Sequence, residues 1–594
     1  MPELKIKAAI SEAFKSLFDH TIDSGEINLQ PTRKEFSGTY TFVVFPYLKI
    51  TKSNPEQSGT QLGEWLKENT DFISDFNVVK GFLNLEISDR EWVSALHAIA
   101  SDQDYGTIPA KNEKVMVEFS SPNTNKPLHL GHLRNNFLGD STARILKANG
   151  YEVMKVNLVN DRGIHICKSM LAYQRFGNNE TPADAGMKGD HLVGKYYVKF
   201  DQEYKKEINE LIEKGRSPED AKKEAPSIRA AQEMLKKWEE GDSETVSLWE
   251  KLNGWVYEGF DQTYETMGIS FDKMYQESNT YLLGKDIVDE GLNKGVFFKK
   301  EDGSVWVDLT DEGMDEKLVL RGDGTAVYMT QDIGTSEMKH ADFPFDKSVF
   351  VVGNEQDYHF RVLFAIMKKM GRPYADGLYH LSYGMVDLPS GKMKSREGTV
   401  VDADDLLQEM FDTAQQHTVE LGKIEGMNEE EALELYRMLG LGALKYFLLK
   451  VDPKKRMLFD PKESIEFQGH TGPFIQYSHA RISAILRRAK SLETGTDFEI
   501  EKVGALSPRE VELIYKLTDF SSSIQEAGKE YSPSILAQYV YDVAKDYNGF
   551  YQEVPIFNED NKDKLGFRIA LSAATAQVIK KGMDLLGIQV PERM

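Results

Sequence analysis

A histidine- and lysine-bearing segment, SPNTNKPLHLGHLRN at residues 121–135, has the residue types that a triphosphate site requires. His129 and His132 are three residues apart, so one face of a helix can present both. Gly131 carries no side chain that would keep a nucleotide away, and Lys126 adds a positive charge. Free N–H groups at a helix start favour anions. The segment therefore predicts a site for a triphosphate and for negative charge that develops on it.

A capped helix with two surface histidines is the simpler interpretation of the same pattern. Zinc binding is not expected, because further ligands at plausible spacing are missing and Cys167 is the only cysteine. One cysteine also excludes an internal disulfide framework.

A second basic segment, GMVDLPSGKMKSREGTVV at residues 384–401, contains KMKSR at 392–396. Positioned cations stabilise the charge that builds on phosphate oxygens when a carboxylate attacks the α-phosphate of ATP. Gly384, Gly391 and Gly398 would let such a loop close over a nucleotide and open again. Taken alone, the segment is better interpreted as a solvated basic loop.

Two further segments contain carboxylates and neutral acceptors that a cationic ligand would need, RGDGTAVYMTQDIGT at 321–335 and VVGNEQDYHF at 351–360. A guanidinium carries five donors and a fixed charge, so its pocket needs carboxylates and neutral acceptors. Tyr328 and Asp332 are four residues apart and share one face if the stretch is helical. Asp332 as a helix cap and Tyr328 as a core residue are the alternatives.

Hydrophobic patterning places these segments on a parallel sheet. A strand at 115–121, a helix ending near residue 149 and a strand at 153–159 predict a right-handed βαβ unit. A strand at 348–353, a helix around 358–370 and a strand at 378–386 predict a second unit. The densely charged helical stretch between them predicts an insertion into one doubly wound domain.

The two ends of the chain predict separate domains. Residues 1 to about 112 combine a helical start with strand-like runs at 39–45 and 81–87, which indicates a small α/β domain. From about residue 425 the pattern is helical and has no fixed repeat, which favours a bundle. The helices are expected at 429–450, 472–491, 508–528, 533–549 and 562–586.

Composition limits the possible functions. The 594 residues are 40% hydrophobic and 28% charged, no apolar run suits a membrane span, and the start lacks a signal peptide, so we expect a cytoplasmic protein. The net charge of −23 argues against a general nucleic-acid binder, although a local basic face remains compatible with it. No interface is evident in the sequence, and we expect a monomer.

HLGH at 129–132 resembles the His-Ile-Gly-His signature of class I aminoacyl-tRNA synthetases, and residues 121–135 closely resemble the arginyl members. KMKSR stands where that class carries Lys-Met-Ser-Lys-Ser. It matches at Lys392 and Met393 and departs at Lys394, Ser395 and Arg396. In arginyl enzymes a lysine just before the first signature is thought to compensate, and Lys126 occupies that position.

The resemblance implies an ATP-dependent enzyme that forms arginyl-adenylate and transfers arginine to the terminal adenosine of tRNA(Arg), with L-arginine, ATP and Mg²⁺ as ligands and no structural zinc. The implied ATP-binding and catalytic residues are Lys126, His129, Gly131, His132, Gly384, Lys392, Met393, Lys394, Ser395 and Arg396. The implied arginine-binding residues are Glu118, Ser121, Asn123, Tyr328, Asp332 and Gln356, with Glu118 and Asp332 on the guanidinium. The implied tRNA contacts are Phe82, Asn84, Gln476, Tyr477 and Arg481.

The expected fold is multidomain α/β, with a Rossmann-type doubly wound parallel sheet in the catalytic domain. The expected divisions are a tRNA-contacting α/β domain at 1–112, a catalytic domain at 113–400 with an insertion at about 180–260, stem helices at 401–460 and an all-α anticodon-binding bundle at 461–594.

Other classes of protein share parts of this pattern. A ligase that activates small acids without tRNA would have the same core but little use for the end domains. A non-catalytic paralogue would explain the irregular KMKSR, and a synthetase for another amino acid would not need both Glu118 and Asp332.

Overall fold

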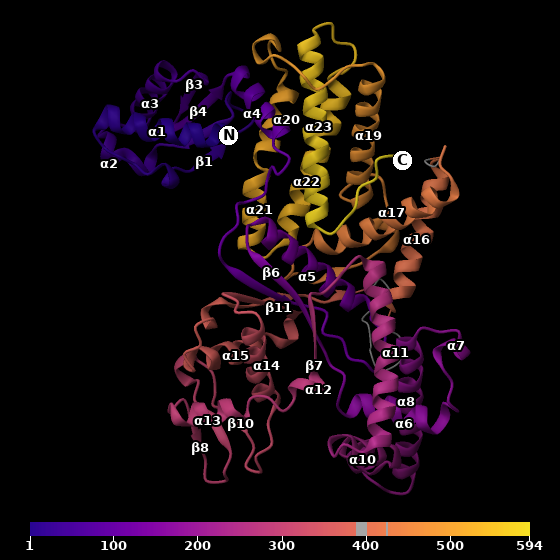
Figure 1. Cartoon of the computed structure of the whole chain (residues 1–594). Coiled ribbons are helices and arrows are strands. Elements are labelled where there is room, and N and C mark those ends of the chain that lie inside the picture. The colour runs from indigo at the N-terminus through magenta and orange to yellow at the C-terminus, as the bar shows by residue number, and fades with distance from the viewer. Residues whose placement is uncertain (388–400, 423–425) are drawn as a thin grey trace.

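The computed structural model describes residues 1–387, 401–422 and 426–594. A small N-terminal domain lies beside the upper part of a helical bundle that the C-terminal part of the chain forms, and a parallel sheet lies below the bundle (Figure 1). The insertion and a second lobe extend from the sheet on the side away from the bundle.

The N-terminal domain packs helices on an antiparallel sheet of order β1-β2-β4-β3. Apolar side chains of the two central strands, including Phe42, Leu83 and Leu85, form the buried core of this domain. Its elements are α1 (Pro2–Phe18), β1 (Leu29–Pro31), β2 (Tyr40–Val43), α2 (Leu48–Thr51), α3 (Pro55–Asn69), β3 (Ile73–Val79), β4 (Phe82–Ile87) and α4 (Asp89–Ser101).

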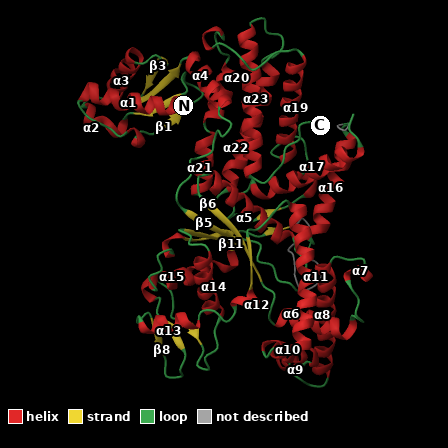
Figure 2. Ribbon diagram, in the orientation of Figure 1, coloured by secondary structure: helices red, strands yellow, loops and turns green. Residues whose placement is uncertain are grey.

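The five-stranded sheet is parallel and has the order β12-β11-β5-β6-β7 (Figure 2). Both predicted βαβ units are present. The elements are β5 (Lys114–Glu118), α5 (Leu130–Ala148), β6 (Glu152–Val159), β7 (Lys273–Gln276), β11 (Lys347–Gly353), α15 (Asp357–Lys369) and β12 (Leu378–Tyr383). The chain turns toward β6 after β5 and returns to β11 on the other side, so the carboxyl ends of β5 and β11 form the switch point where such sheets bind ligands.

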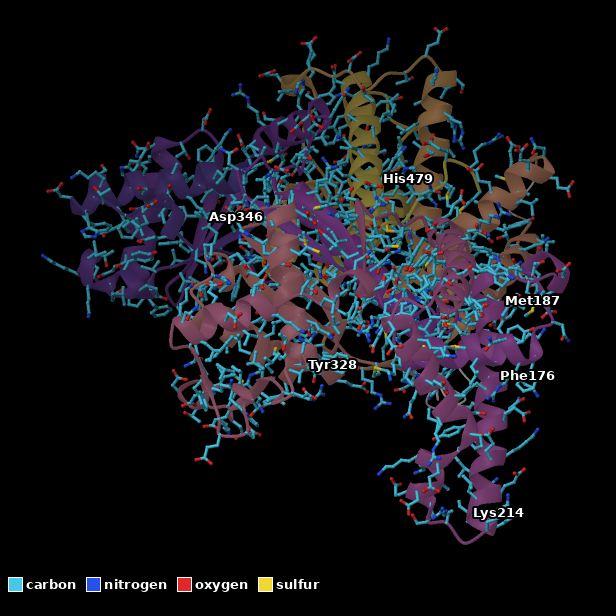
Figure 3. All side chains as sticks on the ribbon, turned by 60° about the horizontal axis from the view of Figure 1, so that its bottom comes forward. Phe176, Met187, Lys214, Tyr328, Asp346 and His479 are labelled. Atoms are coloured by element: carbon cyan, nitrogen blue, oxygen red, sulfur yellow. The ribbon has the colours of Figure 1, made fainter. Side chains whose placement is uncertain are left out.

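Helices fill the connection between β6 and β7. They are α6 (Ile164–Phe176), α7 (Pro182–Ala185), α8 (Gly189–Glu213), α9 (Pro218–Glu224), α10 (Pro226–Glu239) and α11 (Ser243–Met267). Buried Tyr173 and Tyr196 meet edge to face where α6 packs on α8. Lys214 marks the tip of this insertion, far from the sheet (Figure 3). The helices extend beyond the predicted 180–260 at both ends.

The connection between β7 and β11 holds a lobe that the patterning did not predict. An antiparallel sheet of order β10-β9-β8 packs there with helices. The elements are α12 (Glu277–Thr280), α13 (Lys285–Asn293), β8 (Phe297–Lys299), β9 (Val305–Val307), β10 (Lys317–Leu320) and α14 (Tyr328–Asp342). Its strands are only three or four residues long, too short to give a clear alternation.

The C-terminal part is helical, as predicted, apart from a short pairing of β13 (Val386–Asp387) with β14 (Met457–Leu458). The helices are α16 (Ala403–Glu420), α17 (Glu429–Leu449), α18 (Pro461–Ser464), α19 (Gly472–Ser491), α20 (Pro508–Thr518), α21 (Phe520–Lys529), α22 (Pro533–Glu553) and α23 (Lys562–Leu585). The prediction of a single helix at 508–528 is wrong, because the helix is interrupted at Asp519 and continues as a separate helix. The break directs the fully buried Phe520 against Tyr105 and Tyr539.

Within these described ranges, no helix combines the length and the apolar character that crossing a membrane requires.

Candidate active site

Two histidines cap the first turn of α5. His129 is the N-cap residue, and its Nδ1 accepts a hydrogen bond from the backbone N–H of Gly131 at 3.1 Å. The Nδ1 of His132 accepts from the backbone N–H of His129, also at 3.1 Å. The two rings lie 4.0 Å apart between centroids. The structure confirms that these two histidines cap the helix, and their role toward a ligand stays a prediction.

Both imidazoles are neutral at physiological pH. Burial, with the positive charge of Lys126 nearby, lowers the pKa of His129 to about 3, and burial holds the pKa of His132 well below its ordinary value. A neutral imidazole whose Nδ1 accepts a hydrogen bond carries its proton on Nε2. Each ring can therefore offer an N–H donor to an anion without carrying a charge of its own.

Close packing explains the two predicted glycines. A Cβ on Gly131 would lie 3.0 Å from Cε1 of His129, so the glycine makes room for the capping ring. A Cβ on Gly384 would lie 2.7 Å from the carbonyl oxygen of Lys455. The fully buried Arg134 donates to the carbonyl oxygens of Gly384, at 2.6 Å, and Lys455, at 2.9 Å. These contacts join α5 to the start of the second basic segment.

The predicted residues Lys392, Met393, Lys394, Ser395 and Arg396 lie outside the described residues. Lys126 lies just before α5, and burial lowers the pKa of its ammonium.

The turn after β5 has a left-handed backbone at two successive serines, with φ of 74° at Ser120 and 44° at Ser121. The predicted strand 115–121 therefore ends at Glu118. Asn135 Oδ1 accepts from the N–H of Ser120 at 2.5 Å, and Asn157 Oδ1 accepts from that of Ser121 at 3.0 Å. Such backbone persists only where its surroundings impose it, and it is concentrated at functional sites.

Asp332 and Tyr328 lie on α14, one turn apart, as the spacing predicted. Tyr328 is 76% exposed, and Figure 3 labels it on the lobe between β7 and β11. Asp332 Oδ2 lies 2.6 Å from Nε2 of His359, and this hydrogen bond raises the pKa of His359. Gln356 is exposed at the end of β11, and Ser121 and Asn123 are exposed after β5. The switch point thus brings the two predicted halves of the pocket to one edge of the sheet.

Glu118 has a different partner from the one predicted. Its carboxylate pairs with the ammonium of Lys339 on α14, and both side chains are buried. Lys339 lies two turns after Asp332, so the ion pair holds α14 against β5. In this arrangement Asp332 is the more accessible of the two carboxylates predicted for a guanidinium.

Glu277 is a further acidic residue at this edge that the sequence reasoning missed. It follows β7 directly and is partly buried. Burial, with the carboxylates of Asp161 and Asp332 nearby, raises its pKa to about 7. The signal that could have found it is its position at the carboxyl end of a strand, but β7 has only four residues and was not predicted.

Two of the predicted tRNA contacts point into the protein. Gln476 is fully buried and donates to the carbonyl oxygens of Met438 and Gln589. Asn84 is 1% exposed and is hydrogen-bonded to Thr41 and Asn77. In the described structure these two side chains are therefore directed away from solvent, and their contact with tRNA stays a prediction.

The other three candidates are more accessible. Phe82 is partly exposed and packs edge to face with Phe45. The guanidinium of Arg481 lies over the rings of Tyr477, at 4.9 Å, and Tyr551, at 5.3 Å. This group of one arginine and two tyrosines, on α19 and α22, is suited to stacking against unpaired bases.

Family models match most of the chain. Residues 95–460 match the model described as "tRNA synthetases class I (R), catalytic domain", residues 475–594 match the "DALR anticodon binding domain", and residues 4–87 match the "Arginyl tRNA synthetase N terminal domain". The fold and the capped HLGH helix agree with the first match, and they define a class I aminoacyl-tRNA synthetase.

Relatives define the subfamily. The chain is 58% identical to the "Arginine--tRNA ligase" of Amoebophilus asiaticus and 56% identical to that of Bacteroides thetaiotaomicron, with 100% of each chain covered. The solved arginyl-tRNA synthetase of Thermus thermophilus matches with a TM-score of 0.81 at 25% identity, over 100% of both chains. This chain belongs to the arginyl-tRNA synthetase family.

Proposed function

We propose that the chain activates L-arginine with ATP and transfers it to the 3′-terminal adenosine of tRNA(Arg). The observation that carries the proposal is that the neutral HLGH pair and the acidic positions Asp332 and Glu277 all lie at the carboxyl edge of one parallel sheet. An anion site and a guanidinium site at this edge suit ATP and arginine as joint substrates.

In the first step the carboxylate of arginine attacks the α-phosphate of ATP, and pyrophosphate leaves. The Nε2–H groups of His129 and His132 and the ammonium of Lys126 stabilise charge on the phosphate oxygens. ATP use follows from the class, and Mg²⁺ bound to ATP would share this charge. No side chain needs to act as a nucleophile, so catalysis consists of placement and charge stabilisation.

Arginine recognition is assigned to the lobe between β7 and β11 and to the segments that follow β5 and β11. Asp332 and Glu277 accept from the guanidinium, with Tyr328 beside Asp332. Ser121, Asn123 and Gln356 take the α-amino and carboxylate end. Glu118 supports the pocket through Lys339.

For the transfer step, a tRNA hydroxyl attacks the arginyl carbonyl and AMP leaves. We propose Arg481, Tyr477 and Tyr551 as the contact for unpaired anticodon bases, and Phe82 as a contact of the N-terminal domain. The domain divisions proposed for these roles are 1–112, 113–400, 401–460 and 461–594.

Charging of total tRNA with each of the twenty radiolabelled amino acids, with ATP and Mg²⁺, tests the function. Charging with arginine alone is expected. Charging with another amino acid would overturn the pocket assignment. No charging at all would favour the ligase that acts without tRNA or the non-catalytic paralogue, and ATP–pyrophosphate exchange without tRNA would separate these two.

The pocket also predicts a pH dependence. As pH rises, His359 loses its proton at a pKa above the ordinary value, and Glu277 loses its proton near pH 7. Both changes make the pocket more negative while arginine stays cationic. The KM for arginine is therefore expected to fall roughly fivefold between about pH 6 and pH 8.

The dependence should weaken in His359→Gln and in Glu277→Gln. His340→Gln is the matched control, since His340 is on α14 but stacks on Tyr374. A KM for arginine that stays constant with pH in the wild type would contradict the assignment of both groups.

A further inference from the structure

The start of α8 holds a charged cluster outside the proposed pocket. Lys188 Nζ lies 2.5 Å from Asp404 Oδ2 and 2.6 Å from Thr263 Oγ1 on α11. His191 Nε2 lies 2.9 Å from the same Asp404 oxygen. Thr263 also donates to Asp404 Oδ1, at 2.9 Å. Asp404, in the first turn of α16, is thus held by two helices of the insertion.

A buried carboxylate completes the cluster. Asp190 is fully buried, its Oδ2 lies 3.7 Å from Lys188 Nζ, and neither of its oxygens has a hydrogen-bond partner. Although Asp190, His191 and Asp404 are close enough together to hold a metal ion, the ammonium of Lys188 lies between two of these carboxylates and supplies the cation. The cluster is therefore better described as a fixed ionic junction than as a metal site.

The junction is next to residues 401–403, which are hydrogen-bonded to the HLGH segment. The N–H of Leu130 donates to the carbonyl oxygen of Val401 at 3.1 Å, and the N–H of Ala403 donates to that of Leu128 at 3.0 Å. These bonds pair the two residues that flank His129 with residues 401–403. Asp404 follows these residues immediately, so its ionic contacts hold residues 401–403 against the turn that contains His129, where His129 and Asp402 form an isolated antiparallel bridge.

The same helix also touches the other side of the segment. A Cβ on Gly194 of α8 would lie 2.9 Å from Cδ of Pro127 and 3.7 Å from Cα of Lys126. One turn earlier, Asp190 packs so closely on Gly259 of α11 that a Cβ there would lie 2.3 Å from its Oδ1. The first two turns of α8 are therefore wedged between α11 and the approach to α5.

We propose that Lys188, His191 and Asp404 are positioning residues for the phosphate-binding start of α5, through which the insertion fixes Lys126 and His129 for ATP. The proposal rests on the proposed ATP-dependent reaction. None of the three residues touches the reacting atoms. Their effect is carried by the backbone pairing of residues 128–130 with 401–403 and by the contact of Gly194 with Pro127.

Asp404→Asn tests the proposal in the full-length enzyme, with aminoacylation followed at varied ATP and at varied arginine. The KM for ATP is expected to rise about tenfold, because small displacements of a substrate-binding group have large effects. The KM for arginine is expected to change less than twofold. Asp405→Asn is the matched control, since Asp405 is the next residue of the same helix turn and is exposed.

Lys188→Met provides a second variant if Asp404→Asn folds poorly, which thermal unfolding will reveal. The double variant is expected to have the ATP KM of either single variant, because both changes break one junction. An unchanged KM for ATP, or equal increases in the KM values for ATP and arginine, would overturn the proposal. Failure of the wild type to charge arginine would instead reject the proposed function.

Discussion

Replacement of Asp332 by asparagine is expected to lower kcat/KM for arginine by roughly 100- to 1,000-fold, because a guanidinium would lose its charged acceptor inside a pocket. The change is nearly isosteric, so α14 keeps its shape and Tyr328 its place one turn away. The KM for ATP is expected to stay within about twofold, since the HLGH start lies on another element.

Asp342→Asn is the control for Asp332→Asn. Asp342 is the last residue of α14, its side chain is 35% exposed against 37% for Asp332, and it is paired with Lys273. The exposed ion pair contributes at most about 1 kcal/mol. Arginine kinetics should therefore be unaffected in this variant.

Citrulline adds a second readout. This neutral analogue leaves the charge of Asp332 unmatched in the wild type, whereas asparagine removes that penalty. In Asp332→Asn the inhibition constant of citrulline is therefore expected to be closer to the KM for arginine than in the wild type. If the variant bound arginine and citrulline more weakly by the same factor, Asp332 would only maintain the fold of the lobe.

Local sequence rules predicted the elements that carry the site. The spacing of His129 and His132 behind a strand predicted the start of α5, and the four-residue spacing of Tyr328 and Asp332 predicted a shared helix face. These predictions depend only on the period of a helix and on strand–helix alternation, which neighbouring residues set.

Contacts between distant segments were not predictable in the same way. Glu118 pairs with Lys339, 221 residues later, and no local pattern links the two. The resemblance implied that Gln476 contacts tRNA, yet its buried side-chain amide donates to the carbonyl oxygen of Gln589 in the C-terminal segment. Glu277 follows a short strand whose place in the sheet depends on β6 and the whole insertion. Such residues are assigned by tertiary structure, which sequence periodicity does not describe.

His129→Asn is the second variant with a large expected effect. Asparagine is among the best N-cap residues, so it can take over the hydrogen bond to the start of α5. It places no imidazole Nε2–H toward the phosphates. The rate constant for arginine activation is expected to fall roughly 100- to 1,000-fold, the usual cost of removing one preorganised donor. The melting temperature is expected to remain that of the wild type.

His129→Ala separates the two roles of this residue. Alanine removes both the cap and the donor, so it should match the activity loss of His129→Asn and also lower stability by about 1 kcal/mol. Single-turnover aminoacylation and thermal unfolding of both variants measure the two quantities. If asparagine restored activity along with stability, the imidazole would act only as a helix cap, and phosphate stabilisation would have to be reassigned to Lys126 and the backbone N–H groups of α5. If asparagine restored stability alone, the ring would have a chemical role independent of the helix that it caps.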